Sequence, residues 1–587
     1  MTQHLPNQGV LEDQYDVIVV GSGAAGLSTA VRAAYQGLSV LVLEKTEVFG
    51  GTSAWSGGWL WIPRNPLAQR AGIQEPFDAP LAYVNSEMGD SCPDDRVLSF
   101  LEKGPEMVSF FEQETALRFI DGNGIPDFHT SNGHALGGRS VAAAPFDGRT
   151  LGDWKHVLRK PLSVISLWGM GIASGQDLKH FFNATRSVRS ALYVAKRIGR
   201  HALDLLRYGR STQLVNGNAL VAALLKSAVD RGVYLQNHAK VSALHQQGGS
   251  VTGVDVTIHG QPKKIRARLG VVMAAGGFPH DPERQNKLFP QRVGTQHFSA
   301  APKSNTGDGL NMAELIGAKI RDDLDNPGAW SPVSLVPSKH GNIHFPHLIE
   351  RAKPGIIAVL PNGKRFTSEA DSYHDFMKAL YAATPVGEEP HCWLIVDHKA
   401  QRRWGLGWSR PFPFPTAIYE RKGYLHRGTT VEDLARKIRV PEAALAQTIK
   451  RFNRDAQLGH DQEFARGESP YNAIQGDPDN QPNSSLAPLE QAPFYAVRIV
   501  AGSLGTFAGI ATNAQGQALS ITGDPISGLF AVGNDMSSLF EGNYPSGGIT
   551  LGPAMTFGYI IADVLKQQSV QPTADLSSSE EENHAVL

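Results

Sequence analysis

Three glycines near the start of the chain could hold a pyrophosphate. They are Gly21, Gly23 and Gly26, in the spacing G-x-G-x-x-G. The first permits a tight turn, the second lets the backbone approach a pyrophosphate, and the third lets a helix pack closely on a strand. Glu44 lies 18 residues beyond Gly26, close to the spacing of about 20 expected for a carboxylate that binds ribose hydroxyls. The pattern predicts a dinucleotide site.

The predicted secondary structure places these residues where that chemistry requires them. Residues 15–20, YDVIVV, form an apolar, β-branched run typical of a buried parallel strand. The stretch after Gly26 has helical spacing and ends at Gly37, and residues 38–43, LSVLVL, predict a second strand that ends at Glu44. The intervening helix would present free N–H groups and a positive dipole end to the phosphates.

The composition argues against several other classes of protein. With 587 residues, of which 41% are hydrophobic, the chain can bury one large core or two. Its net charge of -1 creates no field that would attract nucleic acid. Cys92 and Cys392 are too far apart in sequence for a CxxC pair, and the histidines form no spaced ligand set, so we predict no metal site.

Three further segments bear on location. Residues 1–14 lack the basic start and apolar core of a signal peptide, and no apolar run of about 18 residues exists, so we expect a cytoplasmic protein. Residues 186–210 form a basic segment with helical spacing, which we interpret as a solvated surface helix; the alternative is peripheral membrane contact. Residues 567–587 are polar and acidic and predict a disordered tail.

The turn after Glu44 indicates which kind of dinucleotide the glycine motif binds. Residues 48–58, VFGGTSAWSGG, combine glycines with hydroxyls, which suits a backbone that runs beside a second nucleotide half and a flat ring system. The turn resembles that of the flavoprotein family containing fumarate reductases, succinate dehydrogenases and 3-ketosteroid dehydrogenases, where it contacts the pyrophosphate, ribityl chain and flavin. Members with covalent flavin usually carry a histidine in this turn. None is present here, so the resemblance implies non-covalent FAD.

The resemblance extends over most of the chain, because later segments match the family's further FAD-binding segments in order. The helix that follows the last glycine pair would direct its positive end at the flavin N1/O2 edge. The residues that the resemblance assigns to FAD are Gly21, Ser22, Gly23, Ala24, Ala25, Gly26, Glu44, Lys45, Gly50, Gly51, Thr52, Ser53, Ser56, Gly57, Gly58, Val241, Ala275, Gly276, Asp308, Gly533, Asn534, Gly548, Ile549 and Leu551.

These segments lie at both ends of the chain. We therefore expect an α/β fold in which a Rossmann-like FAD-binding domain is assembled from both ends and carries an inserted α+β capping domain. The FAD-binding domain would comprise residues 1–310 and 491–566, and the catalytic capping domain residues 311–490.

Two tyrosines occupy places where the fumarate and succinate enzymes of the family carry arginines. Tyr373 follows the segment 363–369, GKRFTSE, and Tyr544 precedes the pair Gly547 and Gly548. Arginines would hold a dicarboxylate, whereas two phenols remove both charges and suit a neutral ketone. This pattern resembles that of the 3-ketosteroid Δ1-dehydrogenases.

The implied chemistry removes one hydrogen from the α-carbon and one from the β-carbon of a ketone. The Tyr544 hydroxyl and the Gly548 N–H could stabilise the enolate oxygen, Tyr373 would take the proton from the α-carbon, and the β-carbon would give hydride to flavin N5. Because a free phenol has a pKa of about 10, this base needs a nearby donor or a positive potential. A further active-site tyrosine of that branch corresponds to Phe128, which lacks the hydroxyl.

Several alternatives remain open at this level. Phe128 and the segment 534–542 depart from the steroid pattern, so the same chemistry could serve a smaller cyclic ketone or a Δ4 desaturation. A flavin-dependent enoate reductase and a flavin-binding protein without turnover are further hypotheses. No second glycine motif predicts an NAD(P)H site, so electrons should leave to an external acceptor such as a quinone. The expected substrate is an apolar ketone, steroidal or monocyclic.

Overall fold

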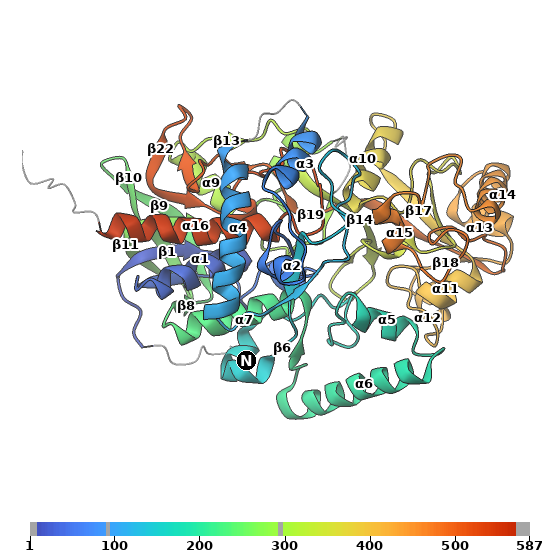
Figure 1. Cartoon of the computed structure of the whole chain (residues 1–587), viewed down its shortest axis with the longest axis horizontal. Helices are drawn as coiled ribbons and strands as arrows, with labels where there is room; N and C mark the ends of the chain where they lie inside the picture. Colours follow the sequence, from blue (N-terminus) through green and yellow to red (C-terminus); the bar gives the residue numbers. More distant parts are fainter. Residues whose placement is uncertain (1–8, 90–93, 291–296, 571–587) are drawn as a thin grey trace, which may run out of the picture.

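The computed structural model describes residues 9–89, 94–290 and 297–570 (Figure 1). The glycine motif directly follows strand β1 of an eight-stranded sheet. The strand order is β21-β22-β11-β1-β2-β8, and β10 and β9 extend antiparallel from β11. The five strands from β22 to β8 run parallel. The strands are β1 Gln14–Val20, β2 Val40–Leu43, β8 Tyr234–Gln236, β9 Ala239–Gln247, β10 Ser250–Ile258, β11 Gln261–Met273, β21 Gln517–Leu519 and β22 Pro525–Ala531.

Helix α1, Ala24–Tyr35, begins directly after the glycine turn, with Gly23 as its N-cap residue. It packs against α7, Asn216–Asp230, and α16, Leu551–Val570. Helix α16 is apolar on nearly every side, as expected for a helix in the core. Because β22 pairs with β11 and α16 packs on α1, the end of the chain returns to complete the layer in which its start lies.

A second sheet of seven strands forms the other half of the molecule (Figure 1). Its order is β15-β14-β19-β17-β16, and β12 and β18 also pair with β19. The strands are β12 Phe298–Ser299, β14 Gly328–Val336, β15 Ile343–Pro346, β16 Ile356–Val359, β17 His391–Val396, β18 His426–Gly428 and β19 Phe494–Thr506.

The central strand of this sheet corrects one predicted boundary. The sequence predicts that residues after 490 belong to the FAD-binding domain. In the structure, β19 pairs with β14 on one side and β17 on the other, so it belongs to the second sheet. Its thirteen residues hold the second sheet together, and the chain returns to the first sheet only at β21. The prediction of a disordered tail is wrong for residues 567–570, which belong to α16; residues 571–587 lie outside the described residues.

The remaining elements are short connections and helices around the two sheets. Three small sheets contain β3 Trp59–Trp61, β4 Phe119–Asp121 and β5 Ser140–Ala143; β6 Phe146–Asp147 and β7 Gln213–Leu214; and β13 Ile320–Arg321 and β20 Gly509–Ile510. The helices are α2 Pro66–Arg70, α3 Asp78–Met88, α4 Asp95–Glu114, α5 Gln176–Phe182, α6 Val188–Tyr208, α8 Pro282–Leu288, α9 Asp308–Leu315, α10 Tyr373–Ala383, α11 His398–Trp404, α12 Ala417–Arg421, α13 Val431–Ile438, α14 Glu442–Leu458 and α15 Pro470–Gln475; four 3₁₀ segments are η1 Ser53–Trp55, η2 Gly148–Val157, η3 Glu350–Ala352 and η4 Gly533–Asp535. Within the described ranges, no helix has the length and apolar character needed to span a membrane.

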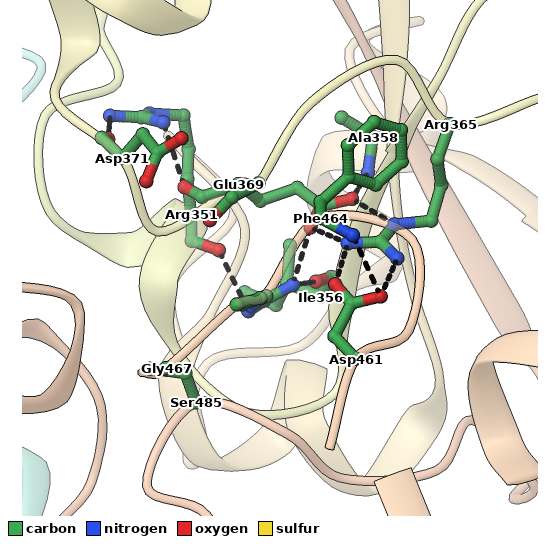
Figure 2. A network of polar contacts seen from close by, with 12 residues as sticks. Arg351, Ile356, Ala358, Arg365, Glu369, Asp371, Asp461, Phe464, Gly467 and Ser485 are labelled. Carbon is green, nitrogen blue, oxygen red and sulfur yellow. Dashed lines mark hydrogen bonds and ion pairs between the residues drawn. The ribbon is translucent and has the colours of Figure 1, made fainter. Parts of the chain in front are cut away.

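A buried ion-pair network fixes the segment that leads to α10 (Figure 2). The Glu369 carboxylate lies 2.7 Å from Arg365 and 2.9 Å from Arg466, and it accepts the Ala358 N–H. Arg365 also pairs with Asp461 at 2.8 Å. Burial by itself raises the pKa of Glu369, but the two guanidinium groups outweigh burial and lower it. The network joins β16, the segment before α10 and the chain before α15, so it positions the start of α10.

We predict that Glu369→Gln strongly destabilises the fold. The substitution leaves two buried guanidinium groups without their shared anion, so the free energy of unfolding should fall by about 3–5 kcal/mol. Urea denaturation followed by intrinsic fluorescence measures the change.

The control is Glu442→Gln, which removes an exposed pair with Arg436 at 3.4 Å. It should cost about 1 kcal/mol or less. Equal losses in the two variants would show that the buried network does not stabilise the segment.

Candidate active site

One cavity of about 1730 Å³ runs between the two sheets and the α5–α6 hairpin. Ligand sites usually measure about 300–1,000 Å³, so this cavity has room for a dinucleotide together with a substrate. Most of the residues predicted to bind FAD line it. They are Gly21, Ser22, Gly23, Ala24, Ala25, Glu44, Lys45, Gly51, Thr52, Ser53, Ser56, Gly57, Gly58, Val241, Ala275, Gly276, Asp308, Gly533, Asn534, Gly548 and Leu551.

Three predicted FAD residues do not line the cavity. Gly26 packs against the Gly21 carbonyl, where a Cβ would lie 2.1 Å from the oxygen. The Gly50 N–H donates to Ser22 Oγ at 3.0 Å. Ile549 is buried beside the glycine turn. The structure thus gives Gly26 and Gly50 roles in holding the loop rather than in lining the cavity.

The glycine turns are suited to a phosphate-binding backbone. Gly21 has φ +116°, and a Cβ there would lie 2.2 Å from the Ala274 carbonyl oxygen. The positive φ and this close contact require glycine. Gly23 lies at the N-terminus of α1, where free N–H groups would meet a pyrophosphate. The cavity therefore has the cradle that FAD needs.

Polar side chains complete the cradle. Ser22 Oγ donates to Glu44 at 2.5 Å, which fixes the acid at the end of β2. Lys45 Nζ lies 2.7 Å from Asp308, so two predicted FAD residues from distant segments are paired. Asp535, which sequence reasoning did not assign, accepts the N–H groups of Ala275 and Gly277 and thereby joins two glycine turns.

The two predicted catalytic tyrosines lie next to each other in the wall of the cavity. Tyr373 is the first residue of α10 and Tyr544 lies in the turn before α16. Their rings are 5.0 Å apart at 81°, and their hydroxyls are hydrogen-bonded to each other. Both tyrosines line the cavity and are otherwise buried. The fold brings together two residues that are far apart in sequence.

The hydrogen bonds of Tyr544 leave its proton available. Burial raises the Tyr544 pKa, while hydrogen bonds from Tyr373 and Thr550 act in the opposite sense, as donors to its oxygen do. With two donors on that oxygen, the Tyr544 O–H is free to point into the cavity. Thr550 was not predicted, because its role depends only on where the turn before α16 places it.

The electrostatics around Tyr373 differ from the sequence-based expectation. Burial and the neighbouring Tyr544 raise the Tyr373 pKa well above its ordinary value, whereas the mechanism inferred from sequence required a lowered pKa. The adjacent His374 supplies no positive charge, because burial lowers its pKa to about 3. The group that does lower the Tyr373 pKa is Arg351, a buried guanidinium whose hydrogen bonds to described residues go to backbone carbonyls. Tyr373 is therefore a neutral phenol in this structure.

Gly548 lines the same cavity as the two phenols, and its conformation requires glycine. Its φ is +102°, and a Cβ would approach the Trp61 nitrogen to 2.6 Å. Its carbonyl accepts the Trp61 N–H, which ties the turn to β3. Among the described residues, its own N–H has no hydrogen-bond acceptor. The Gly548 N–H is thus a second donor available to a ligand oxygen.

Phe128 belongs to the same cluster. Its ring lies 5.8 Å from Tyr373, 5.9 Å from Tyr544 and 4.4 Å from Tyr471. The Phe128 N–H donates to the Pro545 carbonyl, so this loop also supports the Tyr544 turn. Tyr471, on α15, lines the cavity and had no signal in the sequence. It places a phenol beside the position where Phe128 lacks one.

A charged clamp joins the Phe128 loop to α10. His129 Nδ1 lies 2.5 Å from Glu87, and its Nε2 lies 2.8 Å from Asp375. Burial lowers the pKa of His129, but the hydrogen bonds to the two carboxylates outweigh burial and raise it to about 10. Ser372, the N-cap residue of α10, donates to the same Asp375. The clamp therefore sets Phe128 against Tyr373.

Comparison with known proteins shows the family of the chain. The model of the family described as "FAD binding domain" matches residues 16–551. The chain belongs to this family. A 4-oxocyclohex-2-ene-1-carboxylate 5-dehydrogenase from Sinomonas cyclohexanicum is 40% identical over 93% of this chain and 92% of that protein. A 3-oxosteroid 1-dehydrogenase from Mycolicibacterium smegmatis is 36% identical over 94% of this chain and 96% of that protein.

A solved structure shares the whole architecture. The 3-ketosteroid Δ1-dehydrogenase of Sterolibacterium denitrificans, in complex with 1,4-androstadiene-3,17-dione, superposes with a TM-score of 0.87 at 35% identity, covering 95% of this chain and 100% of that one. The open form of a flavocytochrome c3 fumarate reductase, at 21% identity and a TM-score of 0.61 over 95% of this chain and 79% of that one, shares the fold. The chain is an FAD-dependent oxidoreductase acting on CH–CH groups, a 3-ketosteroid Δ1-dehydrogenase-like member of the fumarate reductase and succinate dehydrogenase flavoproteins.

We predict that acid or heat releases intact FAD from the purified protein. No histidine stands in the turn of residues 48–58 that could carry a covalent flavin. Centrifugation after acid treatment, followed by chromatography of the yellow supernatant, measures the release. Flavin that stays with the precipitate would contradict a non-covalent site.

We also predict that His129 makes stability depend on pH. A group whose pKa rises from 6.5 to about 10 on folding stabilises the fold fully below pH 6.5, and this contribution is lost as the pH rises through about 10. Between pH 7 and 10.5 the unfolding temperature of the wild type should therefore fall more than that of His129→Gln. Thermal melts followed by flavin fluorescence measure both proteins. Parallel curves would show that the clamp carries no charge.

Proposed function

We propose that this chain introduces a double bond next to the carbonyl group of a cyclic ketone. The observation that carries the proposal is the pair of hydrogen-bonded phenols that line one cavity together with the free N–H of Gly548. The fumarate and succinate enzymes place arginines at the matching positions, and a pair of neutral donors favours an uncharged carbonyl group instead.

The ketone oxygen would accept hydrogen bonds from the Tyr544 hydroxyl and the Gly548 N–H. Two donors fixed in a buried site stabilise the charge that develops on this oxygen when the α-carbon loses its proton. Thr550 and Tyr373 both donate to the Tyr544 oxygen, so they hold its hydroxyl in the orientation that this contact requires.

Tyr373 would take the proton from the α-carbon and pass its own proton to Tyr544, which gives its proton to the ketone oxygen. This relay converts ketone into enol without forming a phenolate. It is therefore compatible with the raised pKa values of both phenols, which would prevent a mechanism that starts from ionised tyrosine. Proton transfer by positioned side chains contributes about 10²–10⁴-fold to a rate.

The bound FAD would supply the hydride acceptor for the β-carbon. As the enone forms, the oxygen would return its proton through Tyr544 and Tyr373 to solvent, so the substrate loses one hydride to the flavin and one proton to solvent. We propose an external acceptor such as a quinone for the electrons, because the sequence offers no second dinucleotide motif. We also propose that the chain divides into an FAD-binding part and an inserted capping part, and that the capping part ends after β19 rather than at residue 490.

For the substrate we propose a 3-ketosteroid. Beyond the phenols, the cavity is lined by large apolar side chains that suit fused hydrocarbon rings. They include Ile165, Trp168, Phe181, Phe182, Phe345, Phe412 and Phe414. Relatives named 3-oxosteroid 1-dehydrogenase and the solved enzyme with a steroid dione support this choice.

A second candidate is a 4-oxocyclohexane carboxylate. Lys353, Arg403 and Arg410 line the same cavity, and none of the three forms an ion pair within the described residues. Burial, the largest effect, lowers the pKa of Lys353 to about 8, so a carboxylate would stabilise its charged form. The relative that acts on 4-oxocyclohex-2-ene-1-carboxylate supports this candidate.

Anaerobic bleaching of the flavin separates these functions. Steroidal 3-ketones should bleach the FAD within a single turnover, and 4-oxocyclohexanecarboxylate should do so if the second candidate holds. Succinate should not bleach it, nor should fumarate reoxidise the reduced protein, because Tyr373 and Tyr544 replace the cations that such ligands need. Bleaching by neither ketone would contradict the proposed function, and rapid fumarate reduction would favour the enoate reductase.

We predict that the two phenols affect the reaction differently. Tyr373→Phe removes the proton acceptor but leaves both oxygen donors, so the ketone should still bind while flavin reduction slows by about 100-fold or more. Tyr544→Phe removes one donor and should cost a similar factor, about 10²–10³. It should also weaken the binding of phenolic ligands that resemble the enolate. Stopped-flow absorbance at the flavin band measures both effects.

The matched control is Tyr424→Phe. Tyr424 is a buried phenol hydrogen-bonded to Ser334 and does not line the cavity. It should reduce its flavin at the wild-type rate. A wild-type rate in Tyr373→Phe or Tyr544→Phe would show that the phenol in question is only structural.

A further inference from the structure

The cavity wall contains a third tyrosine beside the two phenols, and the proposed mechanism does not use it. Tyr471 belongs to α15, lines the cavity and is 4% exposed. Its ring lies 4.4 Å from that of Phe128, and the Phe128 ring lies 5.8 Å from Tyr373 and 5.9 Å from Tyr544. Three phenols therefore pack around one phenylalanine, and only two of them take part in the proposed relay.

The Tyr471 hydroxyl is not used to hold the fold together. No described residue forms a hydrogen bond with it. A phenylalanine would fill the same space without a buried hydroxyl that lacks a protein partner, and such a hydroxyl is unfavourable. Because the side chain lines the cavity, the hydroxyl can rotate its hydrogen toward a negative charge that develops beside it.

Electrostatic effects show which groups lie near this hydroxyl. Burial is the main cause of the raised pKa of Tyr373, and Tyr544 and Tyr471 raise that pKa further, because phenolates repel one another. Burial also raises the pKa of Tyr471, and Arg351 opposes this rise. Helix α15 packs on the 3₁₀ segment η3, which contains Arg351. Tyr471 thus lies near both the buried guanidinium and the phenol that would take the substrate proton.

The fold fixes Tyr471 relative to Tyr373. The next residue, Asn472, donates from its Nδ2 to Asp371 at 3.0 Å and accepts a hydrogen bond from Ser368 at 3.1 Å. Asp371 and Ser368 belong to the segment that leads to Tyr373, the first residue of α10. The start of α15 and the start of α10 are therefore held by one hydrogen-bonded unit.

We propose that Tyr471 is a positioning residue that directs its hydroxyl dipole at the Tyr373 oxygen during proton transfer. As Tyr373 passes its own proton to Tyr544 and takes the proton of the α-carbon, partial negative charge develops on its oxygen. The Tyr471 hydroxyl, together with the Arg351 guanidinium, stabilises this charge. Tyr471 keeps its own proton, so the balance of the reaction is unchanged. The inference rests on the proposed function, because it requires Tyr373 to act as the proton acceptor.

Flavin reduction by a ketone that bleaches the wild-type holoprotein tests the inference. In Tyr471→Phe the rate measured by anaerobic stopped-flow absorbance should fall about tenfold or more, because a dipole directed at the developing charge is lost. The Kd of the ketone should stay at the wild-type value, because the hydroxyl acts on proton transfer rather than on binding. The flavin spectrum reports whether the variant is folded.

The matched control is Tyr419→Phe. Tyr419 is a phenol that is 5% exposed, packs against Trp408 and does not line the cavity. Its variant should reduce the flavin at the wild-type rate.

The double variant Phe128→Tyr/Tyr471→Phe separates the role of the hydroxyl from the packing of the ring. The Phe128 Cζ, to which the new hydroxyl is attached, lies 3.7 Å from the place that a Cβ on Gly547 would take, in the turn that carries Tyr544. The substitution therefore adds a hydroxyl to the same cluster, and the double variant should reduce its flavin several-fold faster than Tyr471→Phe.

A wild-type rate in Tyr471→Phe would overturn the inference. A double variant no faster than the single one would do so as well, because the loss would then come from packing, and so would a raised Kd at an unchanged rate. These three results leave the proposed function intact, since the wild type is still bleached. If no ketone bleaches the wild-type flavin, the proposed function itself is wrong and the inference fails with it.

Discussion

The hydrogen bond between Tyr373 and Tyr544 is the contact on which the proposed active site depends. The two phenols come from different parts of the molecule: one begins α10 beside the second sheet, and the other lies in the turn before α16, which packs on the first sheet. Their meeting requires the end of the chain to return to the glycine motif and the second sheet to close over it. In the proposed mechanism, the same contact would carry protons between the two neutral phenols.

Supporting structure surrounds the pair on each side. The buried carboxylate of Glu369 holds the segment before Tyr373 through two guanidinium groups (Figure 2). The His129 clamp sets the Phe128 loop against α10, and that loop supports the Tyr544 turn through Pro545. On the other side Gly548 lies so close to Trp61 that no side chain fits. Rigid positioning of this kind is what the proposed proton relay needs.

Much of the cofactor site could be predicted from sequence, because glycine turns between a strand and a helix are local patterns. Gly21 and Glu44 lie where that pattern places them. The two tyrosines were found through family resemblance, and their contact was not visible in the sequence. Tyr471, Thr550 and Arg351 escaped prediction because only tertiary packing brings them to the site. The β19 boundary was wrong for the same reason: an apolar strand does not reveal which sheet it will join.

The double variant Tyr373→Phe/Tyr544→Phe tests the relay most directly, by stopped-flow measurement of flavin reduction with a good ketone. Residues that act as one unit show strongly non-additive effects. The double variant should therefore be about as slow as the slower single variant, since breaking the chain of proton transfers once already abolishes it. If the two losses multiply instead, the phenols act independently and the relay is wrong.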